Sequence, residues 1–409
     1  MPIIFEGATI SGGISIEPSQ LTVPGAPTIG TATATGTTTA TVAFTAPASN
    51  GNSTILSYTA TSSPGGITGT LSQAGSGTIN MTGLTASTSY TFTVTATNAI
   101  GTSSPSASSN SITTDTPVVP KKAIFGYGNT GSVTAITNLV SDTGVVANDT
   151  SGVGTARAEL AAASYGTDKA IFGYGSGGGA QSITNLVSNT GVVATNTTGV
   201  GTARWALAAA GYGTDKAIFG YGTPDGSRVS MTNLVSNTGV VGNDVTGVGT
   251  GRSGLAAAGY GTDKAIFGFG ETAGAVYVSL TNLVSNTGVV SNDTAGVGTA
   301  RVFVGAAGYG SDKAIFGYGA ITGGTVSSLT NLVTNTGVVG NNVTGVGTAR
   351  TYITATSYGI GTAIFGFGYP GGPSYTSITN LVSNTGVVAN DTSGVGTARF
   401  LLAAASYGS

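Results

Sequence analysis

Short apolar runs separated by turn residues recur from residue 121 to residue 409. Within each repeat, a run such as LAAASYG is followed by KAIFGYG, TNLVS and VVAND, in that order. The runs are joined by Thr-Asp and by Asn-Thr-Gly, which are typical connections between antiparallel strands. The pattern therefore predicts four short antiparallel strands in each repeat.

The repeat occurs six times, with consecutive copies 47 to 49 residues apart. A period of this length, built from short strands, favours a closed or stacked β array. The AIFGYG or AIFGFG motif begins at Ala123, Ala170, Ala217, Ala265, Ala314 and Ala363. The shared arginine of the repeat lies at Arg157, Arg204, Arg252, Arg301, Arg350 and Arg399.

The two ends of the array are incomplete in a complementary way. It opens at Lys121 with the second strand of a repeat and closes at Ser409 just after a first strand, FLLAAASYG. Pairing of these ends would complete one repeat and leave no exposed sheet edge. An open solenoid would instead be expected to carry atypical capping repeats. We therefore expect an all-β ring of six blades over residues 117–409, closed by pairing of the C-terminal strand with the first blade.

The order of an arginine, a small-residue strand, a glycine-ended strand and two outer strands resembles kelch repeats. This resemblance covers residues 121–409 and implies a kelch-like β-propeller. The sequence departs from the kelch pattern in two places, because Gly-Tyr-Gly replaces the glycine pair and the outer-strand tryptophan is missing.

Residues 21–116 have a different composition. Residues 22–116 contain no lysine or arginine and one acid, Asp115, with strand and turn signals that predict a β-sandwich. The stretch resembles a fibronectin type III domain in Pro24 to Pro27, VAFTAP, ILSYTAT and GLTASTSYTFTVTATN, the last being the tyrosine corner of that family with Tyr90. Phe44 stands where the family usually has tryptophan, and there is no RGD triplet.

Residues 1–20, MPIIFEGATISGGISIEPSQ, lack the basic start of a signal peptide. They resemble the N-termini of tailed-phage structural proteins, which implies docking to other virion proteins. A disordered leader and a docking strand both remain open for this segment. Residues 117–120, Pro-Val-Val-Pro, predict a short stiff connector.

Composition excludes several classes of function. Only 7% of the residues are charged, against about 25% in typical proteins, and the formal net charge is -2. Such a chain has no electrostatic preference for nucleic acid or anionic lipid. The chain contains no run of 18 apolar residues, so we expect no membrane insertion. It also contains no cysteine, so the redox environment of the protein cannot be inferred from its sequence. We expect no cofactor and no metal.

Catalysis has little chemical basis, because the chain has no histidine and no cysteine. Most acids of the repeats occupy two equivalent turns and so are spread around the array. The first set is Asp168, Asp215, Asp263 and Asp312, and the second is Asp149, Asp244, Asp293 and Asp391. Only Asp142, Glu159, Asp225 and Glu271 lie elsewhere. A glycosidase needs two converging acids, so we predict that the chain is not an enzyme.

Comparison of the six copies shows where they differ. All length differences fall between Gly-Tyr-Gly (or Gly-Phe-Gly) and TNLV, and the residue pair after each arginine also varies. In a four-stranded meander both places emerge on the same face. Because recognition usually resides in loops on a rigid scaffold, this face is the predicted binding site. Its candidate residues are Trp205, Tyr277, Tyr352, Tyr369, Tyr375, Arg228 and Asp225. Strand-start aromatics such as Phe303 and Phe400 are interpreted as filling gaps between blades.

Three repeated features have competing interpretations. The six arginines could form an anion-binding ring, but identical copies favour bonds to carbonyls of their own or the next blade. The Asn-Asp-Thr turns could bind calcium, but two copies carry asparagine, at Asn196 and Asn342, which favours turn chemistry. The residues at the centre of Gly-Tyr-Gly are interpreted as packing between blades, namely Tyr127, Tyr174, Tyr221, Phe269, Tyr318 and Phe367.

Together these features predict a virion surface protein of a tailed phage, a tail fibre or adhesin that binds a host-surface glycan or protein. We expect a homo-oligomer in the particle, made in the host cytoplasm. The main alternative is a capsid or tail decoration protein with a purely structural role. A bacterial secreted adhesin and a carbohydrate-cleaving propeller, using acids such as Glu159, Asp225 or Glu271, are less favoured alternatives.

Overall fold

The computed structural model describes residues 20–117 and 119–408. Within these ranges the regular structure consists of strands, with no helix. The chain divides between residues 118 and 119 into two compact units, each with its own core. The predicted docking segment, residues 1–20, lies outside the described residues except for Gln20.

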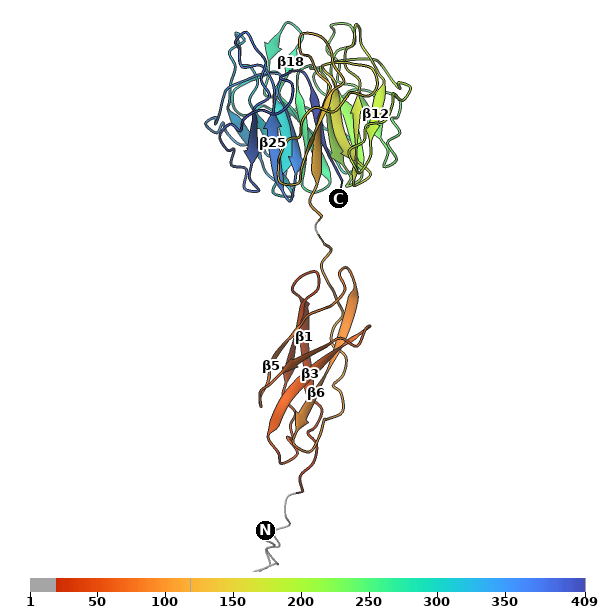
Figure 1. Ribbon diagram of the computed structural model, residues 1–409, viewed down its shortest axis with the longest axis vertical. Coiled ribbons are helices and arrows are strands. Elements are labelled where there is room, and N and C mark those ends of the chain that lie inside the picture. The colour runs from red at the N-terminus through yellow and green to blue at the C-terminus, as the bar shows by residue number, and fades with distance from the viewer. Residues whose placement is uncertain (1–19, 118, 409) are drawn as a thin grey trace, which may run out of the picture. The chain divides into compact units, whose positions relative to one another are not determined.

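The N-terminal unit consists of two antiparallel sheets (Figure 1). One has the order β1-β2-β5 and the other the order β4-β3-β6-β7. Their strands are β1 (Thr28–Ala34), β2 (Ala40–Thr45), β3 (Ile55–Ser63), β4 (Thr68–Leu71), β5 (Gly77–Met81), β6 (Ser89–Asn98) and β7 (Ile112–Thr113).

Alternating residues of both sheets share a single core. Along β6, buried positions such as Phe92 and Val94 alternate with partly exposed threonines, as expected for a strand with one face on the core. Phe44 packs on Tyr58 with ring centroids 4.2 Å apart, at the position where tryptophan was expected. The backbone N–H of Thr85 donates to the Tyr90 hydroxyl at 2.9 Å, which confirms the predicted tyrosine corner.

The C-terminal unit contains six three-stranded sheets and one additional hairpin. The inner strands are β10 (Ala161–Tyr165), β13 (Ala208–Tyr212), β16 (Ala256–Tyr260), β21 (Gly305–Tyr309), β24 (Thr354–Tyr358) and β27 (Ala403–Tyr407). The middle strands are β8 (Lys122–Gly126), β11 (Lys169–Gly173), β14 (Lys216–Gly220), β17 (Lys264–Gly268), β22 (Lys313–Gly317) and β25 (Thr362–Gly366). The outer strands are β9 (Thr137–Val140), β12 (Thr184–Val187), β15 (Thr232–Val235), β20 (Thr281–Val284), β23 (Thr330–Val333) and β26 (Thr379–Val382).

The prediction of four strands per repeat is wrong in one respect. The fourth segment pairs with the outer strand only through isolated bridges, Thr137↔Thr150 and Val140↔Val146 in the first copy. Between these bridges the side-chain amide of Asn138 donates to the Ala147 carbonyl at 3.0 Å. Because a side chain takes the place of a regular ladder bond, the segment bulges and is not a continuous strand.

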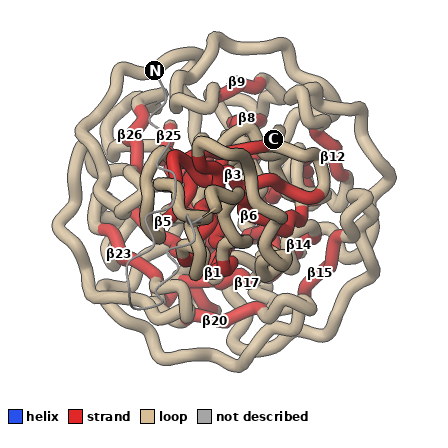
Figure 2. Tube along the Cα trace, turned by 90° about the horizontal axis from the view of Figure 1, so that it is seen from below, coloured by secondary structure: helices blue, strands red, loops and turns tan. Residues whose placement is uncertain are grey.

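The six sheets follow one another in a closed cycle. Each inner strand contacts the inner strands of the two neighbouring sheets, and β27 contacts both β24 and β10. Figure 2 shows the outer strands β9, β12, β15, β20, β23 and β26 spaced around the rim. The two ends of the array meet in the sheet β27-β8-β9, where Ala403 lies opposite Gly126 and Tyr407 opposite Lys122. This is the pairing expected from the two incomplete ends.

Consecutive sheets are packed face to face through aromatic side chains. The last four residues of each middle strand are apolar and buried, as in β11. This composition is expected because both faces of the strand are covered by neighbouring sheets. Phe219 of β14 lies against Gly173 of β11, where a Cβ atom would come within 2.7 Å of the phenylalanine ring. Tyr174 packs on the same ring, with centroids 5.1 Å apart. These contacts recur in every copy and confirm that the Gly-Tyr-Gly aromatics pack between sheets.

Candidate binding face

The two variable parts of each repeat lie at the same end of the sheets. The residue after each arginine pairs with the first residue of a variable loop, for example Trp205 with Thr223 and Thr351 with Tyr369. We call this end the variable face. It comprises residues 129–136, 176–183, 223–231, 271–280, 320–329 and 369–378, with the pairs 158–159, 205–206, 253–254, 302–303, 351–352 and 400–401. In Figure 1 this end of the C-terminal unit is marked by the label of strand β18 (Glu271–Thr272). This strand pairs with β19 (Val276–Tyr277).

The second residue of each variable pair belongs to a ring around a central cavity. These residues, the mouth ring, all have positive φ angles of 52° to 60°. Five backbone hydrogen bonds of 2.7 to 3.3 Å connect them, each from the N–H of one residue to the carbonyl of the preceding one. In order around the ring they are Glu159, Ala206, Gly254, Phe303, Tyr352 and Leu401.

The cavity behind the mouth ring has a volume of about 110 Å³. Its walls are mostly apolar residues at or just before the start of the inner strands, such as Ala161, Leu207 and Leu255. Thr354, which begins β24, adds a hydroxyl group to this lining. Glu159 is the charged residue of its lining.

Five aromatic side chains form a continuous series on the variable face. The ring centroids of Phe303 and Tyr352 are 4.2 Å apart, and those of Tyr352 and Phe400 are 5.5 Å apart. Phe400 stacks on Tyr375 at 4.3 Å, and Tyr375 lies 6.2 Å from Tyr369. We call this the aromatic series, and each of its members is half-buried. It brings together three of the predicted residues, Tyr352, Tyr369 and Tyr375.

Phe303 and Phe400 contact neighbouring repeats, as their interpretation as fillers implies. Phe303 lies between Gly254 of the preceding repeat and Tyr352 of the next one. Phe400 stacks on Tyr375 of the preceding repeat. Phe303 also lines the central cavity, which its place in a variable pair did not specify.

Two of the predicted aromatics lie outside this series. Trp205 is half-buried and is held through its backbone, which exchanges hydrogen bonds of 3.0 and 2.9 Å with Thr223. Tyr277 lies on β19, opposite Glu271 in the additional hairpin. Neither ring stacks on another aromatic residue within the described ranges.

Arg228 and Asp225, the charged candidates of the variable face, both make contacts within the loops. The Arg228 guanidinium forms an ion pair with Glu271 and donates to the Gly226 carbonyl at 2.7 Å, so it connects two neighbouring variable loops. Asp225 is exposed and accepts the Ser227 N–H at 3.0 Å, which shapes its own turn. Both side chains therefore organise loops, and the charge of Arg228 is already neutralised.

The six shared arginines are fully buried, which excludes an anion-binding ring at these positions. Each donates from Nη2 to an asparagine of the next outer strand. Each guanidinium also lies 4.4 to 4.7 Å from the ring of the preceding Gly-Tyr-Gly or Gly-Phe-Gly aromatic. These contacts confirm a structural role between neighbouring sheets.

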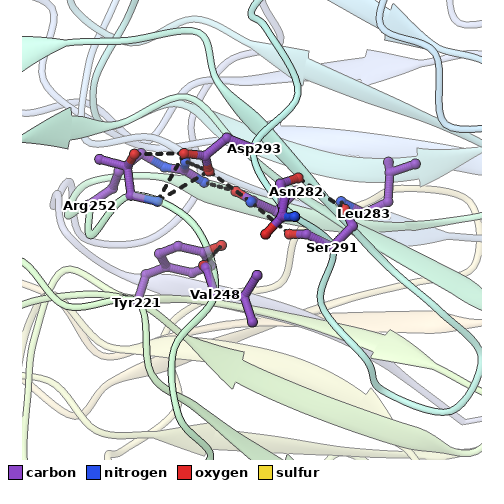
Figure 3. A network of polar contacts seen from close by, with 9 residues as sticks. Tyr221, Val248, Arg252, Asn282, Leu283, Ser291 and Asp293 are labelled. Atoms are coloured by element: carbon purple, nitrogen blue, oxygen red, sulfur yellow. Dashed lines mark hydrogen bonds and ion pairs between the residues drawn. The ribbon is translucent and has the colours of Figure 1, made fainter.

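Figure 3 shows this network in the copy that contains Arg252. Arg252 Nη2 donates to Asn282 Oδ1 at 2.6 Å, and Asn282 Nδ2 donates to Asp293 Oδ1 at 2.9 Å. Tyr221, under the guanidinium, donates its hydroxyl to the Val248 carbonyl at 3.2 Å. Burial raises the pKa of Tyr221 to about 12, so the phenol stays protonated.

The Asn-Asp-Thr turns hold neighbouring repeats together instead of offering calcium ligands. Asp149 accepts the Thr397 N–H and hydroxyl and the Asn138 amide, which joins the last repeat to the first. Burial tends to raise the pKa of Asp149, but these hydrogen bonds outweigh it and the pKa is lowered. Asn196 makes the equivalent contacts with Thr155 by donating from its own amide at 2.7 Å. Within residues 20–117 and 119–408 there is no cluster of three metal-ligating side chains.

Glu159 is the unusual acid of this face. Burial raises its pKa above the ordinary value, and no ion pair with Glu159 occurs among the described residues. Burial, followed by the nearby charge of Glu159, also raises the pKa of Tyr352. Sequence reasoning identified Glu159 as a member of a variable pair and as a candidate acid of a carbohydrate-cleaving propeller. It did not predict the mouth ring, because that ring depends on backbone angles that the residue types do not specify.

The described residues thus form an all-β protein with a repeated scaffold, and its variable face is rich in aromatic side chains. Residues 25–112 match the model of the Fibronectin type III domain, in agreement with the resemblance found in the sequence. No curated protein matches the chain. None of the described residues forms a helix long and apolar enough to cross a membrane.

Proposed function

We propose that the C-terminal unit is a six-bladed, kelch-like β-propeller closed by the pairing of β27 with β8. Six sheets in a closed cycle of contacts support this assignment. The five hydrogen bonds of the mouth ring support it as well, because a central ring of this kind requires each sheet to face the same axis.

We propose that the chain is a tailed-phage virion protein, a tail fibre or adhesin that binds a host-surface glycan or protein through the variable face. The aromatic series carries this proposal. Partly exposed aromatic rings have an apolar face and, in tyrosine, a polar edge, and this combination suits both sugars and protein epitopes. The buried arginine network fixes the sheets beneath, so that the loops present these rings from a rigid frame.

The other parts of the chain have proposed roles consistent with this function. Residues 1–20 dock on other virion proteins, and the particle imposes the oligomeric state of the chain. The fibronectin type III domain is a spacer. The proposal includes no enzymatic activity and no cofactor.

A structural decoration role is the second candidate, and one observation favours it. The end of the sheets opposite the variable face carries one strongly exposed valine per repeat, each 61% to 66% exposed. An array of apolar side chains at equivalent positions is suited to packing against neighbours in a particle. These residues are Val145, Val192, Val240, Val289, Val338 and Val387.

Immunogold electron microscopy with antibodies to residues 119–408 separates these roles. Label at the distal tail, together with loss of cell adsorption when Tyr375 is replaced by Ala, is the result expected for an adhesin. The matched control is Val240→Thr, which changes the opposite end. Label over the capsid, with adsorption unchanged by Tyr375→Ala, would favour decoration, and unlabelled particles would overturn the virion proposal.

A further inference from the structure

The mouth ring is chemically divided into two sides. Glu159 and Phe303 are three positions apart in a ring of six, so they lie across the mouth from each other. One arc between them is Ala206 and Gly254, and the other is Leu401 and Tyr352. The cavity entrance therefore has an acid on one side, an aromatic wall on the opposite side and small residues along one connecting arc.

The aromatic wall is held in place by its neighbours. The ring of Phe303 lies against the α-carbon of Gly254, where a Cβ atom would come within 2.9 Å of Phe303 Cε1. Tyr352 packs on the same phenylalanine, with ring centroids 4.2 Å apart. Because the rings are fixed before any ligand arrives, binding to them costs little conformational entropy.

The acid side has a charge that the described residues do not neutralise. The ion pairs of the lysines join each to the adjacent aspartate of a Thr-Asp-Lys or Ser-Asp-Lys turn, at the opposite end of the sheets. Arg228, the arginine of the variable loops, pairs with Glu271. Burial of Glu159 without a partner disfavours its charged form, and a bound cation would supply the missing partner.

The cavity is suited in size to a small group. A volume of about 110 Å³ exceeds that needed for a single water molecule and is too small for a folded element of a partner protein. A carboxylate facing aromatic rings is the arrangement that recognises organic cations, because the rings attract the positive charge and the acid forms charge-assisted hydrogen bonds.

We propose that the mouth ring binds an organic ammonium group, with Glu159 as its counter-ion and Phe303 and Tyr352 as its aromatic wall. This inference rests on the proposed receptor-binding function and names the chemistry of the receptor. The ammonium group belongs either to an amino sugar with a free amine or to a choline headgroup. These two sources share the cation and differ in whether the nitrogen can donate a hydrogen bond.

The test is titration calorimetry of the full chain with glucosamine, choline, N-acetylglucosamine and glucose. We expect glucosamine or choline to bind, and both neutral sugars to bind at least about tenfold more weakly. Preference for glucosamine identifies an amino sugar, since only its nitrogen donates to Glu159, and preference for choline identifies the quaternary headgroup. Equal affinity for glucose and glucosamine would overturn the inference.

Three variants locate the binding. Glu159→Gln removes the charge while keeping the side-chain size, and it should weaken cation binding by roughly tenfold or more. Phe303→Leu should weaken it while preserving an apolar side chain beside Gly254. Asp142→Asn is the matched control, because it removes an exposed acid that belongs neither to the variable face nor to the cavity lining, and it should leave affinity unchanged. An equal loss in Asp142→Asn and Glu159→Gln would overturn the assignment to the mouth ring.

Adsorption to host cells separates this inference from the proposed function. Cell binding that depends on Tyr375 but is unaffected by Glu159→Gln, with no binding of either cation, would overturn the ammonium site and leave the adhesin proposal standing. Absence of cell binding by the wild-type chain would overturn the adhesin proposal. Thermal unfolding of each variant is the folding control, and Glu159→Gln is expected to be at least as stable as wild type because it removes a half-buried charge without an ion-pair partner among the described residues.

Discussion

Arginine occupies two contrasting regions of the C-terminal unit. Arg350 is fully buried and donates to the Phe367 and Thr348 carbonyls and to Asn380, all at 2.6 to 2.8 Å. Arg228 keeps about a quarter of its side chain exposed and pairs with Glu271 of the next variable loop. The bond to asparagine recurs in every repeat, whereas the carbonyl bonds are missing at Arg252 and differ at Arg301. The ion pair of Arg228 with Glu271 belongs to one pair of loops.

The contrast separates contacts that are repeated between the sheets from contacts that are particular to the variable face, where we propose that a receptor binds. Between the sheets, a change in one residue would leave buried carbonyls or an asparagine without partners, so each copy keeps the same arginine. On the variable face, the loops differ in length from 8 to 10 residues without changing the strands beneath them. We therefore expect substitutions between the sheets to act on stability and substitutions on the variable face to act on binding.

The largest effect should come from removing β27. A chain that ends at residue 401 leaves β8 with an unpaired edge and removes the contact that joins the last sheet to the first. We expect the C-terminal unit to unfold or aggregate, since an exposed strand edge pairs with other chains. Size-exclusion chromatography measures this outcome.

The matched control for that truncation changes the variable face instead. Replacing residues 271–280 by SGGGAQSI, the sequence of residues 176–183, should give a monodisperse protein with an unchanged unfolding temperature. A truncated chain that elutes like wild type would contradict the role of β27 in closing the array.

Arg350→Met should lower the stability of the C-terminal unit by roughly 3 kcal/mol, because buried polar groups lose a charged partner. Urea denaturation followed by the fluorescence of Trp205, the single tryptophan of the chain, reports on this unit alone. Arg228→Met is the control and should change stability by less than about 1 kcal/mol, as for partly exposed ion pairs. Equal effects of the two variants would remove the distinction between the regions.

Gly317→Ala should cost about 1 to 3 kcal/mol through overpacking. The added Cβ would lie 2.7 Å from Phe365 Cζ, and the phenylalanine is held by the next sheet. Gly179→Ala is the control, because a Cβ there has no neighbour within 4 Å and the backbone is not left-handed. The same denaturation experiment compares them, and a neutral Gly317→Ala would indicate that the sheets have room to separate.

The smallest effect concerns pH. The pKa of Asp149, Asp244, Asp293 and Asp391 is lowered below 3.8, so the folded protein binds protons at these groups more weakly than the unfolded chain. Their contribution to stability is therefore complete above about pH 4 and declines as the pH falls through the folded pKa.

The chain contains its own control for this effect at Asn196 and Asn342. A variant with asparagine at all four aspartates should retain the contacts between repeats and lose less stability between pH 5 and about pH 3 than wild type. Thermal unfolding at the two pH values measures the difference. Some acid sensitivity should remain, since the pKa of Asp215, Asp263 and Asp312 is also lowered. A larger loss in the variant would contradict this role of the aspartates.

Much of the fold followed from sequence because repetition exposes it. Six copies of one strand pattern, and two incomplete ends, predicted the order of the sheets and the pairing of β27 with β8. The fourth strand was not predictable in detail, since the bulge depends on where the Asn138 side chain finds its acceptor. The variable segments were predicted to share one face, and their pairing at one end of the sheets confirms this. That this face binds a receptor stays a prediction.

The limits of the prediction at the variable face have physical reasons. Tyr352, Tyr369 and Tyr375 could be expected on one surface, because they lie in variable segments. The pairing of Arg228 with Glu271 could not, since it depends on the three-dimensional course of two loops of different length. The mouth ring could not be predicted from the sequence, because its positive φ angles occur at residues of types that rarely adopt them, for example the phenylalanine Phe303.

The position of β8 between β27 and β9 has a mechanical consequence. Tension applied at residue 120, against a ligand held on the variable face, would act along the axis of β8. The ladders on both sides of this strand lie across that axis and would be loaded in shear, so that their hydrogen bonds share the force instead of opening one by one. The sheet that joins the two ends of the array is thus also the one placed to carry a pulling force into the unit.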